Sequence, residues 1–180
     1  MIGVLVSGEG SNLQALIDDG VPIVAVAANR ADARALSRAE SVGIATGVFA
    51  LDDYDSRDAR DVAMAEWLAA RGVEWVVLAG YMHLLRPAFL ERFDGRVINV
   101  HPALLPAFPG AHAIEEALAA GVTETGATVH YVDEGVDTGA VIVQERIPVE
   151  QGDTAETLRA RIQAVEHRLL PQVVRELCAR

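Results

Sequence analysis

The first half of the chain alternates short apolar runs with stretches of helical hydrophobic spacing. The apolar runs predict strands at 2–6, 22–28, 44–49, 75–79 and 96–100. Helices are predicted between them at 13–17, 34–42 and 58–71, with a short one after Pro87. Near-continuous apolar strands separated by helices are typical of a parallel sheet covered on both faces. The pattern therefore predicts an α/β fold, Rossmann-like, with a mostly parallel twisted sheet.

The pattern changes after residue 121. Two β-rich runs, 125–132 and 140–149, are joined by a turn around Asp137 that is too short for a crossover helix. They predict an antiparallel pair near the C-terminal end of the sheet. A last amphipathic helix is expected after Asp153 and Thr154, with a kink or break at Pro171.

Two of the predicted helices have a face that should be buried. In the helix at 58–71 this face contains Val62, Ala65, Leu68 and Ala69. In the last helix the expected stripe contains Leu158, Ile162, Val165, Leu169 and Leu170.

Composition narrows the class of protein. A chain of 180 residues with 51% hydrophobic residues is long enough for one core, so residues 1–180 are expected to form a single domain. The net charge of −11 gives no basic surface for nucleic acid or anionic lipid, and neither is an expected partner. All 15 basic residues are arginine, which excludes Schiff-base chemistry through lysine.

Cysteine content and the absence of targeting signals suggest the compartment. Cys178 is the only cysteine, so it cannot form an internal disulfide, and we expect it to be a small apolar filler rather than a nucleophile. The chain shows no basic leader and no apolar run long enough to span a membrane. These features predict a soluble, cytoplasmic protein.

Three loops with chemically useful residues follow predicted strands. They are Gly8–Asn12, Gly80–Leu85 and Asn99–Pro102. In open α/β sheets, ligands bind outside the carboxyl ends of the strands, where such loops diverge. The shared position of these loops points to a binding site more strongly than any one of them does.

The loop at Gly8–Asn12 places two glycines and a hydroxyl directly before a helix. Backbone N–H groups at a helix N-terminus can bind an anion such as phosphate, and Ser11 and Asn12 can add side-chain contacts. The same spacing is compatible with a tight turn in which Ser11 or Asn12 is an ordinary helix cap. The residues alone leave both interpretations open.

Asn99 and His101 lie two residues apart at the end of a strand, so both side chains should point to one face. That face would hold a donor for a developing oxyanion beside an imidazole that can carry a proton. Asp137 would stabilise the imidazolium if its turn folds toward His101. The alternatives are a structural histidine bonded to a loop carbonyl, and an aspartate that bonds its own backbone.

Other reaction classes have little support. The remaining histidines lack metal-ligand spacing, and a single cysteine makes a structural zinc site implausible, so no metal is expected. Ser7 and Ser11 do not lie in a nucleophile elbow. The attacking group is therefore expected to belong to a substrate.

The chain closely resembles the folate-dependent phosphoribosylglycinamide formyltransferase family over essentially its whole length. The matching segments are Ser7–Ala15, Leu78–Met82, Asn99–Pro106, Pro109–His112, Val136–Gly139 and Glu166–His167. The Asn-x-His and Asp-x-Gly pieces are shared by the wider formyltransferase superfamily. The Gly-Ser-Asn-Leu-Gln loop points to the glycinamide ribonucleotide branch.

The resemblance implies a function and a set of site residues. It implies formyl transfer from 10-formyltetrahydrofolate, as cosubstrate, to the amine of 5'-phosphoribosylglycinamide in purine (IMP) biosynthesis. The implied catalytic residues are Asn99, His101 and Asp137. Ribonucleotide binding is implied for Gly10, Ser11, Asn12 and Glu166, and folate binding for Arg57, Met82, His83, Leu84, Leu85 and Asn99. Protonated His101 and Asn99 would stabilise the tetrahedral oxyanion.

Several positions depart from the family pattern. His83 stands where relatives often have arginine, Ala103 and Ala107 replace a common serine and a common basic residue, and Ala140 replaces a frequent proline. Their effect on ligand affinity is open, as are the kinetic order, a possible homodimer and the consequence of ending at Arg180.

Rival functions are also open from the sequence. They are formyl transfer to methionyl-tRNA or an amino sugar, hydrolysis of formyltetrahydrofolate, and a catalytically silent nucleotide or folate sensor. A tRNA enzyme should carry a further C-terminal domain and a basic surface, and a hydrolase an N-terminal regulatory domain. None of these features is expected for this chain.

Overall fold

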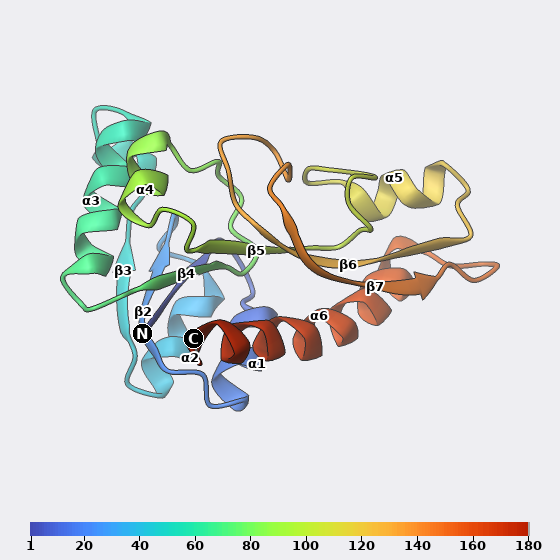
Figure 1. Cartoon of the computed structure of the whole chain (residues 1–180), viewed down its shortest axis with the longest axis horizontal. Helices are drawn as coiled ribbons and strands as arrows, with labels where there is room; N and C mark the ends of the chain where they lie inside the picture. The colour runs from blue at the N-terminus through green and yellow to red at the C-terminus, as the bar shows by residue number, and fades with distance from the viewer. Residues whose placement is uncertain (180) are drawn as a thin grey trace. The chain divides into compact units, whose positions relative to one another are not determined.

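The protein is described by a computed structural model that covers residues 1–179 (Figure 1). The chain divides into two compact units, residues 1–98 and 99–180, each with its own internal contacts. These are the first unit and the second unit.

The first unit is built on parallel strands. They are β1 (Ile2–Val6), β2 (Ile23–Ala28), β3 (Ala45–Val48) and β4 (Trp75–Leu78), hydrogen-bonded in the order β3-β2-β1-β4. Val4 of β1 is in register with Val26 of β2 on one side and with Val77 of β4 on the other. All five residues of β1 are buried, as the unbroken apolar run predicts for a central parallel strand.

Helices connect these strands and cover both faces of the sheet. They are α1 (Ser11–Asp18), α2 (Arg34–Ser41), α3 (Arg57–Ala69) and α4 (Pro87–Arg92), with a short 3₁₀ turn at Leu51–Asp53 that the hydrophobic pattern does not reveal. Figure 1 shows α1 and α2 on one face of these strands and α3 and α4 on the other. Pro87 takes the first turn of α4, as predicted.

The buried face of α3 differs from the predicted one. Val62 is 40% exposed, and the buried residues of this helix are Arg60, Asp61, Met64, Ala65 and Leu68. The prediction is right for Ala65 and Leu68 and wrong for Val62, because it placed apolar residues inside by default, whereas an arginine and an aspartate occupy the first buried turn.

The second unit contains a strand pair and two helices. β5 (Val97–His101) begins in the first unit and ends in the second, where the strand order is β5-β6-β7. β6 (Glu124–Tyr131) and β7 (Val141–Pro148) are antiparallel, as predicted, with a register shift between Val129 and His130. Helix α5 (Ala113–Ala119) was not predicted, because its seven residues give too short a hydrophobic pattern.

The long helix α6 (Ala155–Cys178) completes this unit. Leu158 and Ile162 pack with residues of α5, β6 and β7 in one apolar cluster, and Val165, part of the expected stripe, is only partly buried against it. The helix is continuous through Pro171, so a break there, one of the two predicted outcomes, is wrong. Buried neighbours on both sides of Pro171 hold the helix although one backbone hydrogen bond is lost.

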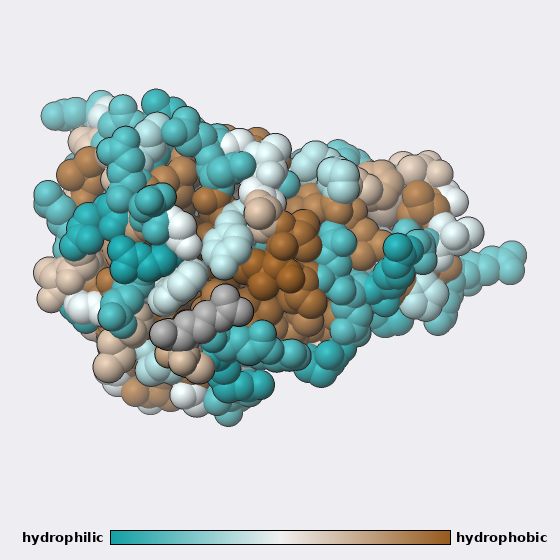
Figure 2. All heavy atoms as spheres, viewed as in Figure 1, coloured by the Kyte–Doolittle hydropathy of each residue, from teal (hydrophilic) through white to brown (hydrophobic). Residues whose placement is uncertain are grey.

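The surface is mixed in character. Figure 2 shows hydrophilic residues over much of the face in view and apolar residues gathered in a patch near its middle. Cys178 is exposed, so the prediction that it fills apolar space is wrong. None of the helices within residues 1–179 combines the length and the apolar composition that a membrane crossing needs.

Candidate active site

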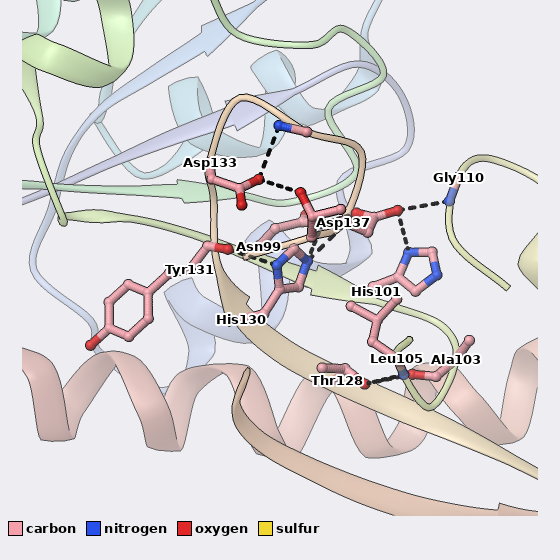
Figure 3. A network of polar contacts seen from close by, with 12 residues as sticks. Asn99, His101, Ala103, Leu105, Gly110, Thr128, His130, Tyr131, Asp133 and Asp137 are labelled. Carbon is pink, nitrogen blue, oxygen red and sulfur yellow. Dashed lines mark hydrogen bonds and ion pairs between the residues drawn. The ribbon is translucent and has the colours of Figure 1, made fainter. Parts of the chain in front are cut away.

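Asn99 and His101 end strand β5 in the second unit and point to the same side of it (Figure 3). His101 is 4% exposed and Asn99 is partly buried. The alternation of side chains along a strand therefore places an amide and an imidazole side by side.

Asp137 reaches these residues from the loop between β6 and β7. Its backbone has a φ of 54°, in the left-handed region that aspartate tolerates better than most residues. The loop is held by Asp133, whose Oδ1 accepts hydrogen bonds from Gly135 N and Thr138 Oγ1. Gly139 is required at the end of the loop, because a Cβ there would lie 1.8 Å from the Tyr131 carbonyl oxygen.

His101 is held between two oxygen acceptors. Its Nδ1 lies 3.3 Å from Asp137 Oδ2, and its Nε2 lies 2.7 Å from the Phe108 carbonyl oxygen. Phe108 has a φ of 53°, which is unusual for a bulky residue and turns that carbonyl into place. Because neither acceptor can donate a proton, the arrangement is complementary to an imidazolium with both ring nitrogens protonated.

His130 is a member of this group that the sequence interpretation missed. It is 2% exposed, lies at the β-bulge near the end of β6, and has its Nε2 3.1 Å from Asn99 Nδ2 and 3.5 Å from Asp137 Oδ1. Bulges are frequent beside active sites. The signal in the sequence was a histidine near the end of a β-rich run, shortly before the Asp137 loop.

The charge of Asp137 fixes the hydrogen bonds of its neighbours. A carboxylate can only accept, so Asn99 must turn its Nδ2 toward Asp137 Oδ1, at 3.3 Å. The second hydrogen of that nitrogen then points to His130 Nε2, which must be an acceptor. Nδ1 of His130 therefore carries the proton and donates it to the Tyr131 carbonyl at 2.8 Å. In this state His130 is neutral and both amide hydrogens of Asn99 are in use.

Asp137 is strongly acidic in this setting. Burial by itself would raise the pKa of its carboxyl group, but the polar contacts with the His130 ring and with Gly110 N–H, and the charge of His101, outweigh burial and lower the pKa to about 2. The Gly110 N–H donates to Oδ2 at 2.7 Å. Asp137 is thus a carboxylate throughout the neutral pH range.

The loop at Gly8–Asn12 belongs to the first unit. Gly10 is the N-cap residue of α1, with a φ of 73° and no side-chain cap, so the interpretation of Ser11 or Asn12 as an ordinary N-cap is wrong. A Cβ at Gly10 would lie 2.6 Å from the Ala35 side chain, which explains the glycine. Arg38 donates from Nε to the Glu9 carbonyl at 2.8 Å and holds the loop against α2.

The residues predicted to bind folate, apart from Asn99, also lie in the first unit. Met82 and Leu84 are 66% and 50% exposed, which is unusual for large apolar side chains, while Leu85 is buried. Met82 N donates to Ser7 Oγ at 2.9 Å, and the His83 ring is partly buried. Arg57 is exposed at the start of α3.

The remaining predictions concern Glu166 and Ala103 in the second unit, and the absence of a metal site. Glu166 is 6% exposed on α6. Ala103, where a serine is common in relatives, is fully buried, and its carbonyl accepts a hydrogen bond from Thr128 Oγ1 at 2.6 Å. Within residues 1–179, no group of three or more histidine, cysteine, aspartate or glutamate side chains is placed to hold a metal ion.

Sequence comparison places this geometry in a family. The sequence model of the formyl transferase family matches residues 1–174, almost the whole chain and all of the residues described above. The chain belongs to the formyl transferase family. The Asn99, His101 and Asp137 group therefore lies in a member of a formyl-transferring family.

Individual relatives agree with this assignment. A phosphoribosylglycinamide formyltransferase of Mycobacterium tuberculosis is 48% identical over 179 residues, covering 97% of this chain and 83% of that protein. The trifunctional purine biosynthetic protein adenosine-3 of Drosophila pseudoobscura pseudoobscura is 48% identical over 181 residues. The match covers 96% of this chain but only 13% of the length of the Drosophila protein.

Solved structures confirm the fold. The glycinamide ribonucleotide transformylase 1 of Symbiobacterium toebii has a TM-score of 0.94 and 48% identity, with 97% of this chain and 85% of that chain covered. The phosphoribosylglycinamide formyltransferase of Streptococcus pneumoniae TIGR4 has a TM-score of 0.94 and 43% identity, with 98% and 97% covered. The predicted α/β fold, mostly parallel with antiparallel strands near the C-terminal end, is confirmed.

Proposed function

We propose that this protein transfers the formyl group of 10-formyltetrahydrofolate to the amine of 5'-phosphoribosylglycinamide, a step of purine (IMP) biosynthesis. The products are phosphoribosyl-N-formylglycinamide and tetrahydrofolate. The observation that supports the proposal most is the convergence of Asn99, His101 and Asp137 in the second unit, with Asp137 Oδ2 3.3 Å from His101 Nδ1. Membership of the formyl transferase family and the names of the closely similar relatives support the choice of substrates.

The reaction needs no protein nucleophile. The substrate amine attacks the formyl carbon, the bond from that carbon to N10 of the folate breaks, the amine loses one proton and N10 gains one. Asn99 and protonated His101 would stabilise the oxyanion through N–H groups, and His101 would release either Phe108 or Asp137 to do so. Both amide hydrogens of Asn99 are already bonded, so the oxyanion takes one of them from His130 or Asp137.

Asp137 acts by its charge rather than as a base. A carboxyl group whose pKa is lowered to about 2 is too weak a base to hold a proton at neutral pH. Its role is to keep His101 oriented and to stabilise the positive charge on that imidazole. Histidine is the side chain that exchanges protons near neutral pH, so His101 and His130 are the candidates for moving the proton from the amine to N10.

Substrate binding is assigned to the remaining predicted residues. Gly10, Ser11 and Asn12 would bind the phosphate through uncapped N–H groups at the start of α1, with Glu166 near the ribose. Arg57, Met82, His83, Leu84, Leu85 and Asn99 would bind the folate. The exposed apolar side chains of Met82 and Leu84 are suited to a flat heterocycle.

The organisation of the protein follows from the same proposal. We propose that residues 1–180 act as one formyltransferase domain, because a single family model matches residues of both units. Its partners would be small-molecule substrates in the cytoplasm, without a nucleic acid, a membrane or a metal.

The test is a spectrophotometric assay of tetrahydrofolate release by the purified protein. Release should require both 10-formyltetrahydrofolate and phosphoribosylglycinamide. H101N should lower kcat by about 10²-fold or more with both substrates still bound, whereas H112N, a change to an exposed histidine of the same unit, should have no effect. Release without the acceptor would indicate a hydrolase, and binding of both ligands without release would indicate a sensor; either result overturns the proposal.

A further inference from the structure

An arginine and an aspartate, Arg60 and Asp61, are adjacent on α3, and both are fully buried. Arg60 donates from Nε to Asp61 Oδ1 at 2.7 Å, and its NH2 group lies 2.6 Å from the same oxygen. Removing two charges from water is costly, and a buried pair gains little stability over apolar residues of similar size. The pair therefore calls for an explanation beyond packing.

The polar atoms of this pair reach the segment that carries Met82 and Leu84. Arg60 NH1 lies 2.6 Å from His83 Nδ1, and Asp61 Oδ2 accepts a hydrogen bond from Arg86 N at 2.7 Å. Together with the bond from Met82 N to Ser7 Oγ, these contacts hold the segment at three points within five residues. The backbone is thereby anchored on both sides of Leu84.

The contact with Arg60 sets the proton position of His83. A guanidinium can only donate, so Nδ1 of the imidazole must accept and the ring proton must lie on Nε2. Nε2 faces the side-chain amide of Asn29 at 3.2 Å, and the oxygen of that amide is buried without another partner within residues 1–179. If the side-chain amide of Asn29 is flipped by 180°, its oxygen accepts a hydrogen bond from His83 Nε2–H. The flip thus pairs both the imidazole N–H and the buried amide oxygen.

The electrostatic surroundings favour the same neutral state. Burial is the largest influence and lowers the pKa of His83, the charges of Arg60 and Arg57 lower it further, and Asp61 opposes them. The Tyr81 ring packs against the imidazole edge to face, with ring centroids 5.9 Å apart. His83 is thus a neutral ring whose nitrogens are both engaged and whose orientation is fixed.

We propose that Arg60 and Asp61 are positioning residues for the formyl-donor site, Arg60 by orienting His83 and Asp61 by anchoring the backbone at Arg86. This inference rests on the proposed function, in which Met82–Leu85 contact the folate. Within residues 1–179, the backbone N–H and C=O groups of Leu84 and Leu85 make no hydrogen bond to the protein. Such groups can bind the polar edge of a heterocycle only if the segment is held in place.

The kinetic test compares variants of the full-length protein. R60M should raise KM for 10-formyltetrahydrofolate about tenfold, the effect of losing one hydrogen bond to a charged group, with kcat and KM for phosphoribosylglycinamide within about twofold of wild type. R60K, which keeps one donor, should recover part of the loss. E66Q, at an exposed position of the same helix, is the control and should change nothing. The proposal would be overturned if R60M impaired kcat and the KM values of both substrates to the same extent. It would also be overturned if KM for the formyl donor did not change.

A second variant and a spectroscopic measurement keep the test independent of folding and of turnover. If R60M fails to fold, the double variant R60M/D61N removes both buried charges and should show the same weakened binding of tetrahydrofolate in calorimetry. In wild-type protein with nitrogen-15 histidine, the signal of His83, assigned by its loss in H83N, should show Nε2 protonated and Nδ1 unprotonated. A proton on Nδ1 of His83 would refute the role of Arg60, whether or not the protein transfers formyl groups. If the proton is on Nε2 but the wild-type protein does not transfer formyl groups, only the proposed function is refuted.

Discussion

The substitution D137N removes one charge at the centre of the active site while it keeps the shape of the side chain. Asp137 faces His101 Nδ1 at 3.3 Å and accepts from Asn99 Nδ2 at 3.3 Å and Gly110 N at 2.7 Å. A hydrogen bond to a charged group contributes about 1.5–3 kcal/mol. If only the contact with His101 strengthens in the transition state, kcat should fall about 10- to 150-fold, since each 1.4 kcal/mol is about a factor of ten.

The assay for this variant is steady-state kinetics with both substrates at neutral pH. KM for either substrate should change much less than kcat, because Asp137 acts through other residues rather than by binding. The matched control is E134Q, an exposed residue of the same loop, which should behave as wild type. A folded D137N protein with kcat within about twofold of wild type would refute the electrostatic role of the carboxylate.

The same variant predicts a pH dependence of stability. Folding lowers the pKa of Asp137 from 3.8 to about 2, so the folded state favours the ionised carboxylate. This contribution is present above the unfolded-state value and is lost as the pH falls through about 2. In urea titrations, the difference in unfolding free energy between wild type and D137N should shrink as the pH falls from about 4 to about 2. A difference that grew on acidification would contradict the assigned shift.

Four further substitutions test other parts of the site. G10A should lower the free energy of unfolding by roughly 1–3 kcal/mol, because the φ of 73° and the neighbouring side chain exclude a Cβ; G8A, where a Cβ meets nothing within 4 Å, should be neutral by the same denaturation measurement. H130N should lower kcat about tenfold with little change in KM, since it removes the imidazole next to Asn99, and an unchanged kcat would exclude His130 from the mechanism. M82S and L84S should raise KM for the formyl donor several-fold while unfolding free energies stay within about 0.5 kcal/mol, because both side chains are exposed; a large loss of stability would show that they are structural.

The fold could be predicted largely because its signals are local. The apolar run at Ile2–Val6 is a buried central strand, and the glycines of the following loop lead directly into a helix. The carboxyl ends of such strands are where ligands bind, which is why Asn99 and His101 were recognisable candidates. The antiparallel pair was predictable from the short turn around Asp137, which leaves no room for a crossover.

The rest depends on contacts between residues distant in sequence. The register shift beside His130 is a property of the pairing of β6 with β7, and neither strand shows it alone. The φ of 53° at Phe108, which turns its carbonyl toward His101, has no sequence signature in a residue of this type. Arg60 was missed for another reason: hydrophobic periodicity treats a charged residue as a solvent-facing position, although this one is buried beside Asp61.

The most direct test of the account follows the formyl carbon itself. Wild-type protein is mixed with phosphoribosylglycinamide and 10-formyltetrahydrofolate labelled with carbon-13 in the formyl group, and the label is followed by NMR. The account predicts that the signal moves to an amide carbon of phosphoribosyl-N-formylglycinamide, at a rate that H101N reduces by about 10²-fold or more. Label that remained on the folate, or that appeared only as free formate, would contradict it.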